Sequence, residues 1–287
     1  MKISKKLSLL LILTLLFGFA FYGYYQNNSI EVSYYSINDE RIPETFHDYT
    51  IVQVSDLHTK DFKGDLHDKI SDQDPDIILI TGDLIDRNRT DLDFAVQAVK
   101  EMIDIAPVYY VSGNHEIASG EYEKLSQELE SIGVKNLDND FDSLEKEGET
   151  IGLVGLEDPL LLTQDEIEET GTAEKVIEKT LATLIEESGT DYTILLSHRA
   201  ELMDIYASTS IDIAFTGHAH GGQIRLPFIE GLYSPSQGFF PKYTSGLYEE
   251  NGTQMIVSRG LGNSIFPVRI NNRPDLVVLT LKTNGIE

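Results

Sequence analysis

The sequence predicts an α/β fold in which buried strands alternate with amphipathic helices, preceded by one apolar N-terminal helix. Short apolar runs rich in β-branched residues recur along the chain, as expected for strands that are covered on both faces. Segments with apolar residues at helical spacing lie between several of these runs. A length of 287 residues suits one large α/β domain or two small ones. We expect one folded domain behind an anchor.

The N-terminus has the features of a membrane anchor. Residues 7–25 contain no charged side chain and follow a basic tail, residues 1–6, with Lys2, Lys5 and Lys6. Nineteen residues of helix are long enough to cross a bilayer, and the lysines favour a cytoplasmic N-terminus with the rest of the chain outside. The alternative is a secreted protein whose signal peptide is cleaved near Gly18-Phe19-Ala20. Because the apolar run continues to Tyr25, we favour an uncleaved single-pass anchor.

The domain is expected to begin after a short connection. Residues 26–48 are interpreted as a tether and an edge strand, and residues 49–287 as the folded domain. Near-continuous apolar runs predict core strands at 51–54, 77–80, 108–111, 151–156, 194–196 and 211–215. Helical spacing predicts helices near 92–103, 122–132 and 177–185.

Two later regions are less regular. The strongly acidic stretch 163–188 is expected to be the solvated face of a helix rather than a cation site. Beyond Gly221, segments punctuated by Gly and Pro and ending at 275–281 predict hairpins and strands of a second sheet.

Charge and cysteine content exclude several classes of function. After the first thirty residues the chain carries 19 basic and 48 acidic residues, a net charge of -29. Such a surface repels nucleic acid, so nucleic-acid binding is not expected as a main function. The absence of cysteine excludes disulfides, thiolate metal sites and cysteine nucleophiles. Any metal ligands must therefore be nitrogen or oxygen.

Five short motifs, each following an apolar run, contain the residue types that bind hard and borderline metal ions. Because ligand sites in alternating strand-helix folds lie at the carboxyl ends of strands, we expect the motifs to meet at one edge of a sheet. Five of the seven histidines fall in them, and His47 and His67 are interpreted as ordinary surface or helix residues. The motifs are Asp56-Leu57-His58, Gly82-Asp83-Leu84-Ile85-Asp86, Gly113-Asn114-His115-Glu116, Ser197-His198 and Gly217-His218-Ala219-His220.

The combination is more informative than any single motif. An Asp-x-His pair or a Gly-Asp turn is usually a cap or a turn, and a lone histidine after a strand is usually structural. Pooled, the motifs supply the ligands for two divalent ions, one carboxylate being available to bridge them. Two ions about 3.5 to 4 Å apart can generate a hydroxide and clamp a phosphoryl group. Mn, Fe and Zn all suit such ligands, and we favour Mn.

The ordered motifs resemble those of the calcineurin-like metallophosphoesterase superfamily, D-x-H, G-D-x-x-D, G-N-H-E, H and G-H-x-H. The run Gly221-Gly222-Gln223-Ile224-Arg225-Leu226-Pro227 is similar to the YkuE-type bacterial branch, many members of which are membrane-tethered or exported. The resemblance implies a four-layer α/β/β/α sandwich of two mixed sheets with residues 49–287 as the catalytic domain.

The resemblance also implies residue roles. One metal would be held by Asp56, His58 and His220, and the other by Asn114, His198 and His218, with Asp83 bridging them. His115 would stabilise the transition state or protonate the leaving oxygen. Asp86 would orient His115, although it could also act as a helix cap.

Several further residues have two interpretations. Arg199, Arg225 and Arg259 are candidates for phosphate contacts, yet arginine in so acidic a chain more often forms surface ion pairs. Aromatic residues could form an apolar substrate lip or touch the membrane, or they could pack a β-hairpin core. These aromatics are Phe228, Tyr233, Phe239, Phe240 and Tyr243.

Together these features predict a monomeric, membrane-anchored phosphoester hydrolase that acts on an extracytoplasmic or cell-envelope phosphate ester. The substrate alternatives are a phosphodiester and a lipid-linked pyrophosphate such as an acylated sugar nucleotide. A non-catalytic envelope-binding module is the alternative to an enzyme. It predicts a missing metal ligand, and none is missing.

Overall fold

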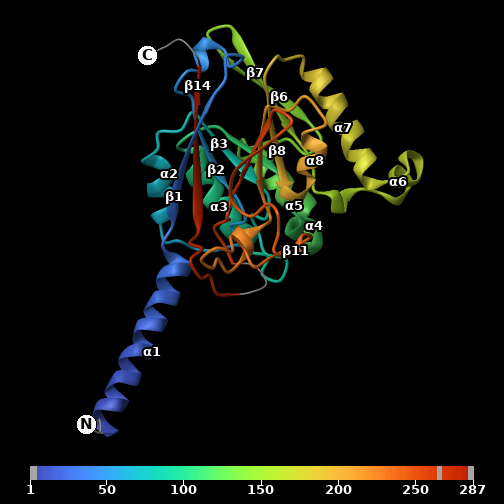
Figure 1. Cartoon of the computed structure of the whole chain (residues 1–287). Helices are drawn as coiled ribbons and strands as arrows, with labels where there is room; N and C mark the ends of the chain where they lie inside the picture. Colours follow the sequence, from blue (N-terminus) through green and yellow to red (C-terminus); the bar gives the residue numbers. More distant parts are fainter. Residues whose placement is uncertain (1–4, 264–266, 284–287) are drawn as a thin grey trace.

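The structure is a computed structural model that describes residues 5–263 and 267–283. A long helix, α1 (Lys5–Asn28), projects from an α/β body that contains two six-stranded sheets (Figure 1). The first sheet has the order β1-β14-β2-β3-β4-β5 and the second β12-β13-β9-β8-β7-β6. Each sheet mixes parallel and antiparallel pairs, because β14 runs antiparallel to β2 while β12 and β6 run antiparallel to their neighbours. The expected pair of mixed sheets is confirmed.

The elements have the following bounds. The strands of the first sheet are β1 (Glu31–Asn38), β14 (Asp275–Lys282), β2 (Thr50–Val54), β3 (Ile77–Thr81), β4 (Val108–Val111) and β5 (Lys135–Asn136). Those of the second are β12 (Gly246–Glu250), β13 (Thr253–Val257), β9 (Ile213–Gly217), β8 (Thr193–Arg199), β7 (Glu149–Gly155) and β6 (Phe141–Lys146), while β10 (Tyr233–Ser234) pairs only with β11 (Gly238–Phe239). The helices after α1 are α2 (Asp65–Ser71), α3 (Leu92–Ile103), α4 (Asn114–Ser119), α5 (Tyr122–Ser131), α6 (Gln164–Thr170), α7 (Ala173–Ser188) and α8 (Met203–Tyr206).

Three apolar clusters hold the layers together. Alternate residues of each strand face opposite sides, so Ile51 of β2 packs between the sheets whereas Val52 faces the outer helices. The inter-sheet cluster joins residues such as Leu79 of the first sheet to Phe215 of the second. Helices α2, α3 and α5 cover the outer face of the first sheet, and α7 and α8 cover that of the second. The result is the expected α/β/β/α arrangement of four layers.

Two expectations about sheet membership were wrong. The apolar runs were expected to deliver their motifs to the edge of one sheet, but β2, β3 and β4 lie in the first sheet and β8 and β9 in the second. The segment 275–281 was assigned to a second sheet, yet β14 lies inside the first, between β1 and β2. A strand between a helix layer and a sheet is as apolar as one between two helix layers. The pattern therefore does not reveal which sheet a strand joins.

Helix α1 is exposed along most of its length. It is the one helix, in the part of the chain that the structure describes, that is long and apolar enough to cross a membrane. It is longer than the expected span 7–25, and only Ser29 and Ile30 separate it from β1, which forms the sheet edge. At the other side of the body, α6 and α7 expose the acidic side chains of 163–188 to solvent.

Candidate metal centre

The five motifs meet where the two sheets come together at the carboxyl ends of their strands. Asp56 and His58 follow β2, Asp83 follows β3, and His218 and His220 follow β9. All five have positive φ angles, between 47° and 65°. A left-handed backbone at a residue other than glycine costs on the order of 1 kcal/mol, and such strain clusters at functional sites. Here the positive φ angles mark sharp turns where the chain leaves strands β2, β3 and β9.

Glycines allow the motifs to approach closely. A Cβ atom on Gly113 would overlap Oδ1 of Asp83, and one on Gly217 would overlap Oδ2 of Asp56. Neither position has room for any side chain. These glycines therefore set how closely the carboxylates can sit to the neighbouring strand ends.

One group of potential ligands gathers around Asp56. Its Oδ1 lies 3.2 Å from Nε2 of His220, and that nitrogen lies 3.1 Å from Nε2 of His58. Oδ2 of Asp83 lies 3.6 Å from Nε2 of His58. These four buried residues present one atom each within 4.8 Å of one another.

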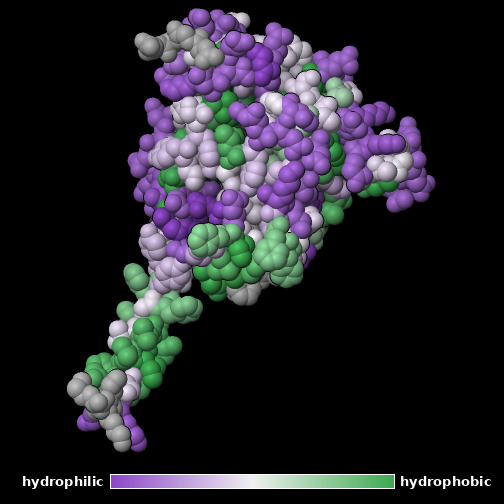
Figure 2. Space-filling view, viewed as in Figure 1, coloured by the Kyte–Doolittle hydropathy of each residue, from purple (hydrophilic) through white to green (hydrophobic). Residues whose placement is uncertain are grey.

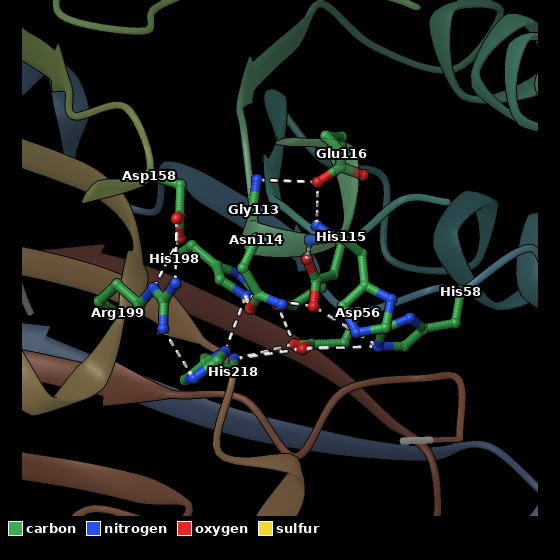
Figure 3. A network of polar contacts seen from close by, with 12 residues as sticks. Asp56, His58, Gly113, Asn114, His115, Glu116, Asp158, His198, Arg199 and His218 are labelled. Carbon is green, nitrogen blue, oxygen red and sulfur yellow. Dashed lines mark hydrogen bonds and ion pairs between the residues drawn. The ribbon is translucent and has the colours of Figure 1, made fainter. Parts of the chain in front are cut away.

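A second group shares Asp83. Its Oδ2 lies 3.3 Å from Nε2 of His198, and the same nitrogen lies 3.1 Å from Nδ1 of His218. Oδ1 of Asn114 is 3.3 Å from Nε2 of His198. One carboxylate oxygen thus faces both groups. Figure 3 shows Asp56, His58, Asn114, His198 and His218 converging in this network.

The spacing fits two divalent ions, and three of the candidate imidazoles are in the state that binds a metal. Ligand atoms bonded at about 2.1 Å to one ion lie roughly 3 to 3.5 Å apart, which matches these distances. Burial lowers the pKa of His58 to about 4 and holds the pKa values of His218 and His220 well below their usual range. These imidazoles are therefore neutral and have a lone pair for a metal. Burial opposes the charge of Asp83, but His198 and His58 hold its pKa well below the usual range.

The proposed catalytic residues flank the first group. Oδ2 of Asp86 lies 3.6 Å from Nδ1 of His115 and also 3.6 Å from Nδ1 of His58. Its Oδ1 accepts a hydrogen bond from the backbone N–H of Asn88, so it also stabilises the turn. The backbone N–H of Arg87 donates to Nδ1 of His115 at 3.2 Å, which leaves the proton of a neutral ring on Nε2. Nδ1 of a neutral His115 therefore has no hydrogen for Asp86, whereas a metal at Nε2 of His58 would leave the ring proton on Nδ1, which faces Asp86.

The comparison with known proteins decides the family. The profile of the calcineurin-like phosphoesterase family matches residues 49–222. The chain belongs to this family. It is 28% identical over 279 residues to the uncharacterized metallophosphoesterase YkuE of Bacillus subtilis, covering 93% of this chain and 91% of YkuE. The YkuE-type branch is therefore confirmed, and the chain is a phosphoester hydrolase with a cluster suited to two divalent metals.

Other relatives have related descriptions. The phosphodiesterase YaeI of Escherichia coli is 24% identical over 242 residues, covering 81% of this chain and 82% of YaeI. A transmembrane protein with a metallophosphoesterase domain from Danio rerio is 27% identical over 255 residues, covering 85% of this chain and 55% of that protein. The crystal structure of TT1561 from Thermus thermophilus aligns with a TM-score of 0.49 and 14% identity, covering 74% of this chain and 90% of TT1561.

Glu116 is a residue of this phosphoesterase whose role was not anticipated from the sequence. It is fully buried, and its carboxylate accepts hydrogen bonds from the backbone N–H groups of Asp83, Gly113 and Ile85 at 2.9, 2.8 and 3.1 Å. Burial and the charge of Asp83 raise the pKa of Glu116 to about 8. It joins the loops after β3 and β4 and so positions Asp83. The spacing of Glu116 three residues after Gly113, as in a capping box, was the available signal.

Of the three candidate arginines, only Arg199 borders the site. Asp158 holds it through bonds of 2.6 Å from Nε and 2.9 Å from Nη2, while Nη1 lies 3.0 Å from Nε2 of His218 and 3.1 Å from Oγ of Ser236. A metal at Nδ1 of His218 would leave the ring proton on Nε2, 3.2 Å from Oγ of Ser236. Arg225 and Arg259 instead make structural bonds to the loop at Thr244 and to β14.

The phosphoesterase site opens to solvent through a small hollow. Its volume is about 120 Å³ and its walls combine metal-ligand candidates with an exposed arginine. Arg87 lies on the rim beside His115 and was not considered as a phosphate contact from the sequence. The two remaining histidines lie elsewhere, His47 after a short 3₁₀ helix and His67 in α2. The lining residues are Asp83, Arg87, Asn114, His115, His218, His220 and Pro235.

Proposed function

We propose that the protein is a membrane-anchored hydrolase of an extracytoplasmic phosphoester and that it uses two divalent ions. The observation that carries this proposal is the sharing of one Asp83 oxygen by two ligand groups. Asp56, His58 and His220 would hold one ion, Asn114, His198 and His218 the other, and Asp83 both. When bound, the ions would supply a hydroxide nucleophile for in-line attack and a positive environment for the phosphoryl oxygens.

The chain's own residues would complete the reaction. The N–H at Nε2 of His115 points away from the Arg87 amide and is available to donate to the departing oxygen. Asp86 would orient His58 by accepting from its Nδ1–H and would stabilise positive charge on the His115 ring electrostatically. The guanidinium of Arg87, on the rim of the hollow, would contact a phosphate oxygen. We favour Mn as the metal and a monomer as the active form.

The membrane assignment is supported by α1 and by its basic N-terminal flank. An 18-residue stretch of helix α1 has a mean hydropathy of 2.0, and none of this stretch is buried in the body. Lysines at the N-terminal end favour the cytoplasm, so the body would lie outside. Protease added to intact cells should then digest the body, whereas protection of the body would contradict this orientation.

A direct test of the hydrolase uses the full-length protein in detergent with Mn, Zn or Fe and soluble chromogenic monoesters and diesters. We expect turnover by the wild type and its loss in Asp83→Asn. Asp93→Asn, an exposed acid of α3, is the matched control and should retain activity. Equal inactivity of all three proteins with every metal, toward these esters and toward lipid pyrophosphates and lipid phosphodiesters, would reject the proposal in favour of an inert binding module.

A lipid-linked pyrophosphate is the second candidate substrate. It is favoured by exposed phenylalanines on the segment that contributes Pro235 to the hollow. Hydrolysis of a lipid pyrophosphate faster than that of a lipid phosphodiester in mixed micelles would select it. The reverse order would select the envelope phosphodiester.

A further inference from the structure

The segment 226–240, here called the aromatic loop, exposes large apolar side chains to solvent. Phe228 is fully exposed, and Phe239 and Phe240 are 70% and 66% exposed. Of the aromatics that were expected either to pack a hairpin core or to contact substrate or membrane, only Tyr243 is buried. Contiguous exposed apolar groups of this size usually mark a binding surface.

The aromatic loop is tied to the end of α1 through two polar side chains. The hydroxyl of Tyr22 in α1 donates to Oδ1 of Asn271 at 2.7 Å, and Nδ2 of Asn271 donates to the carbonyl of Arg225 at 3.1 Å. The backbone N–H of Arg225 in turn donates to the carbonyl of Ile270 at 3.0 Å. The loop begins at the next residue, Leu226. Figure 2 shows the apolar surface at the base of the body beside the emerging apolar helix.

The helix is held firmly where it leaves the body. Oε1 of Gln26 accepts from the backbone N–H of Asn272 at 3.1 Å, and Oδ1 of Asn27 accepts from that of Arg269 at 3.3 Å. The guanidinium of Arg273 lies 5.1 Å from the ring centre of Tyr25. The last turns of α1 therefore have a fixed position relative to the loop, unlike a flexible stalk.

These contacts also fix the level along the axis of α1 at which the aromatic loop lies. Tyr22 lies six residues before the helix end at Asn28, which is about 9 Å at 1.5 Å per residue. At this level α1 still exposes Phe21, Tyr24 and Tyr25, the aromatic residues typical of a membrane interface. A bilayer that surrounds α1 up to these residues must also meet the aromatic loop.

The charge of the loop differs from that of the rest of the body. Residues 224–243 contain one acid, Glu230, and two bases, Arg225 and Lys242, although the chain after residue 30 has a net charge of -29. The loop and its flanks are thus the part of an acidic surface that an anionic bilayer does not repel.

We propose that the aromatic loop is a second membrane contact, which inserts Phe228, Phe239 and Phe240 into the lipid surface beside α1. The inference rests on the proposed anchoring of the chain by α1. It also places the metal centre at the bilayer, because Nδ2 of Asn272 donates to the carbonyl of His220 at 2.8 Å and Pro235 of the loop lines the hollow. The partner is a lipid surface, and the phosphate groups nearest the hollow are those of lipid headgroups.

The absence of tryptophan from the chain allows a specific test. Phe239→Trp in the full-length protein introduces a single reporter on the loop. Thr150→Trp, at an exposed position of β7, is the control, since β7 lies at the end of the body away from α1 (Figure 1). Both variants are reconstituted into phosphatidylcholine/phosphatidylglycerol vesicles with or without lipids brominated on their acyl chains.

We expect brominated lipid to quench the Phe239→Trp emission several-fold more than that of Thr150→Trp. Equal, weak quenching of the two variants would overturn the inference, including the case in which a second copy of the chain covers the loop. Far-ultraviolet circular dichroism melts show that each variant is folded.

The readout is independent of hydrolysis. Strong quenching together with inactivity toward both soluble and lipid-linked phosphate esters would reject the proposed function and still support the membrane contact. Normal turnover of soluble esters without quenching would reject the membrane contact alone.

Discussion

The ion pair between Asp158 and Arg199 gives a prediction whose magnitude follows from the structure. Both side chains are buried, and Asp158 accepts from Nε and Nη2 of Arg199 and from the backbone N–H of Leu160. Asp158→Asn preserves the size of the side chain but places an amide NH₂ against one of these donors. The remaining bonds lose the carboxylate charge, and the buried guanidinium keeps Glu201, 3.5 Å from Nη1, as an ion-pair partner.

The expected cost combines these losses. A hydrogen bond to a charged group contributes about 1.5 to 3 kcal/mol, and breaking a buried ion pair costs about 3 to 5 kcal/mol. Because Asn retains part of the network, we expect a loss of about 3 kcal/mol in the free energy of unfolding. For a body of this size that corresponds to a melting temperature lower by roughly 6–12 °C. Loss of support for Arg199 beside His218 should also reduce kcat by about 10- to 100-fold.

The assay is thermal unfolding of full-length protein followed by circular dichroism, together with turnover of a soluble ester. Asp39→Asn is the matched control because Asp39 also pairs with an arginine, Arg41, whose side chain is 51% exposed. An exposed pair contributes about 0–1 kcal/mol, so this variant should melt close to the wild type. Equal melting temperatures for the Asp158 and Asp39 variants would refute the reasoning.

Three further predictions concern the metal centre. His115→Ala should bind the same number of metals as the wild type while losing about 10²- to 10⁴-fold in kcat, measured by metal analysis and kinetics; loss of a metal would contradict its role. Gly113→Ala should weaken metal binding, because the new methyl would meet Oδ1 of Asp83; calorimetry showing unchanged affinity would count against this. Burial opposes the charge of His198, but Asp83 raises its pKa to about 10. The metal-free protein therefore holds a proton there at neutral pH, which a metal must displace. Affinity should rise with pH until about 10, and calorimetry in two buffers should detect proton release; its absence would exclude a protonated His198.

The sequence predicted the local parts of the site better than the long-range ones. Strand-end motifs such as Asp56-Leu57-His58 are recognisable because a buried strand and the turn after it are adjacent in the chain. The pairing of Asp158 with Arg199 left no comparable signal, since 41 residues separate them. The same holds for Asn272, which connects α1 to the loop at His220 only after folding.

The fold shows the same division. The bounds of β4 and α3 follow from hydrophobic periodicity, which acts over a few residues. The sheet that contains β14 depends on parallel pairing between Glu31 and Asp275, a choice that a local pattern does not encode.

The candidate metal ligands are divided between the two sheets. Their relative positions therefore depend on the packing of the apolar layer between the sheets. Asp83 is carried by the first sheet and His198 by the second, so their separation depends on how Leu79 and Phe215 pack in the layer between. Sliding one sheet by about an ångström would displace the three proposed ligands of the second sheet relative to the four of the first, and errors of that size can cost roughly 10²-fold in rate. Conservative substitutions in that layer, although far from any substrate, should therefore change the geometry of the catalytic site as well as the stability of the protein.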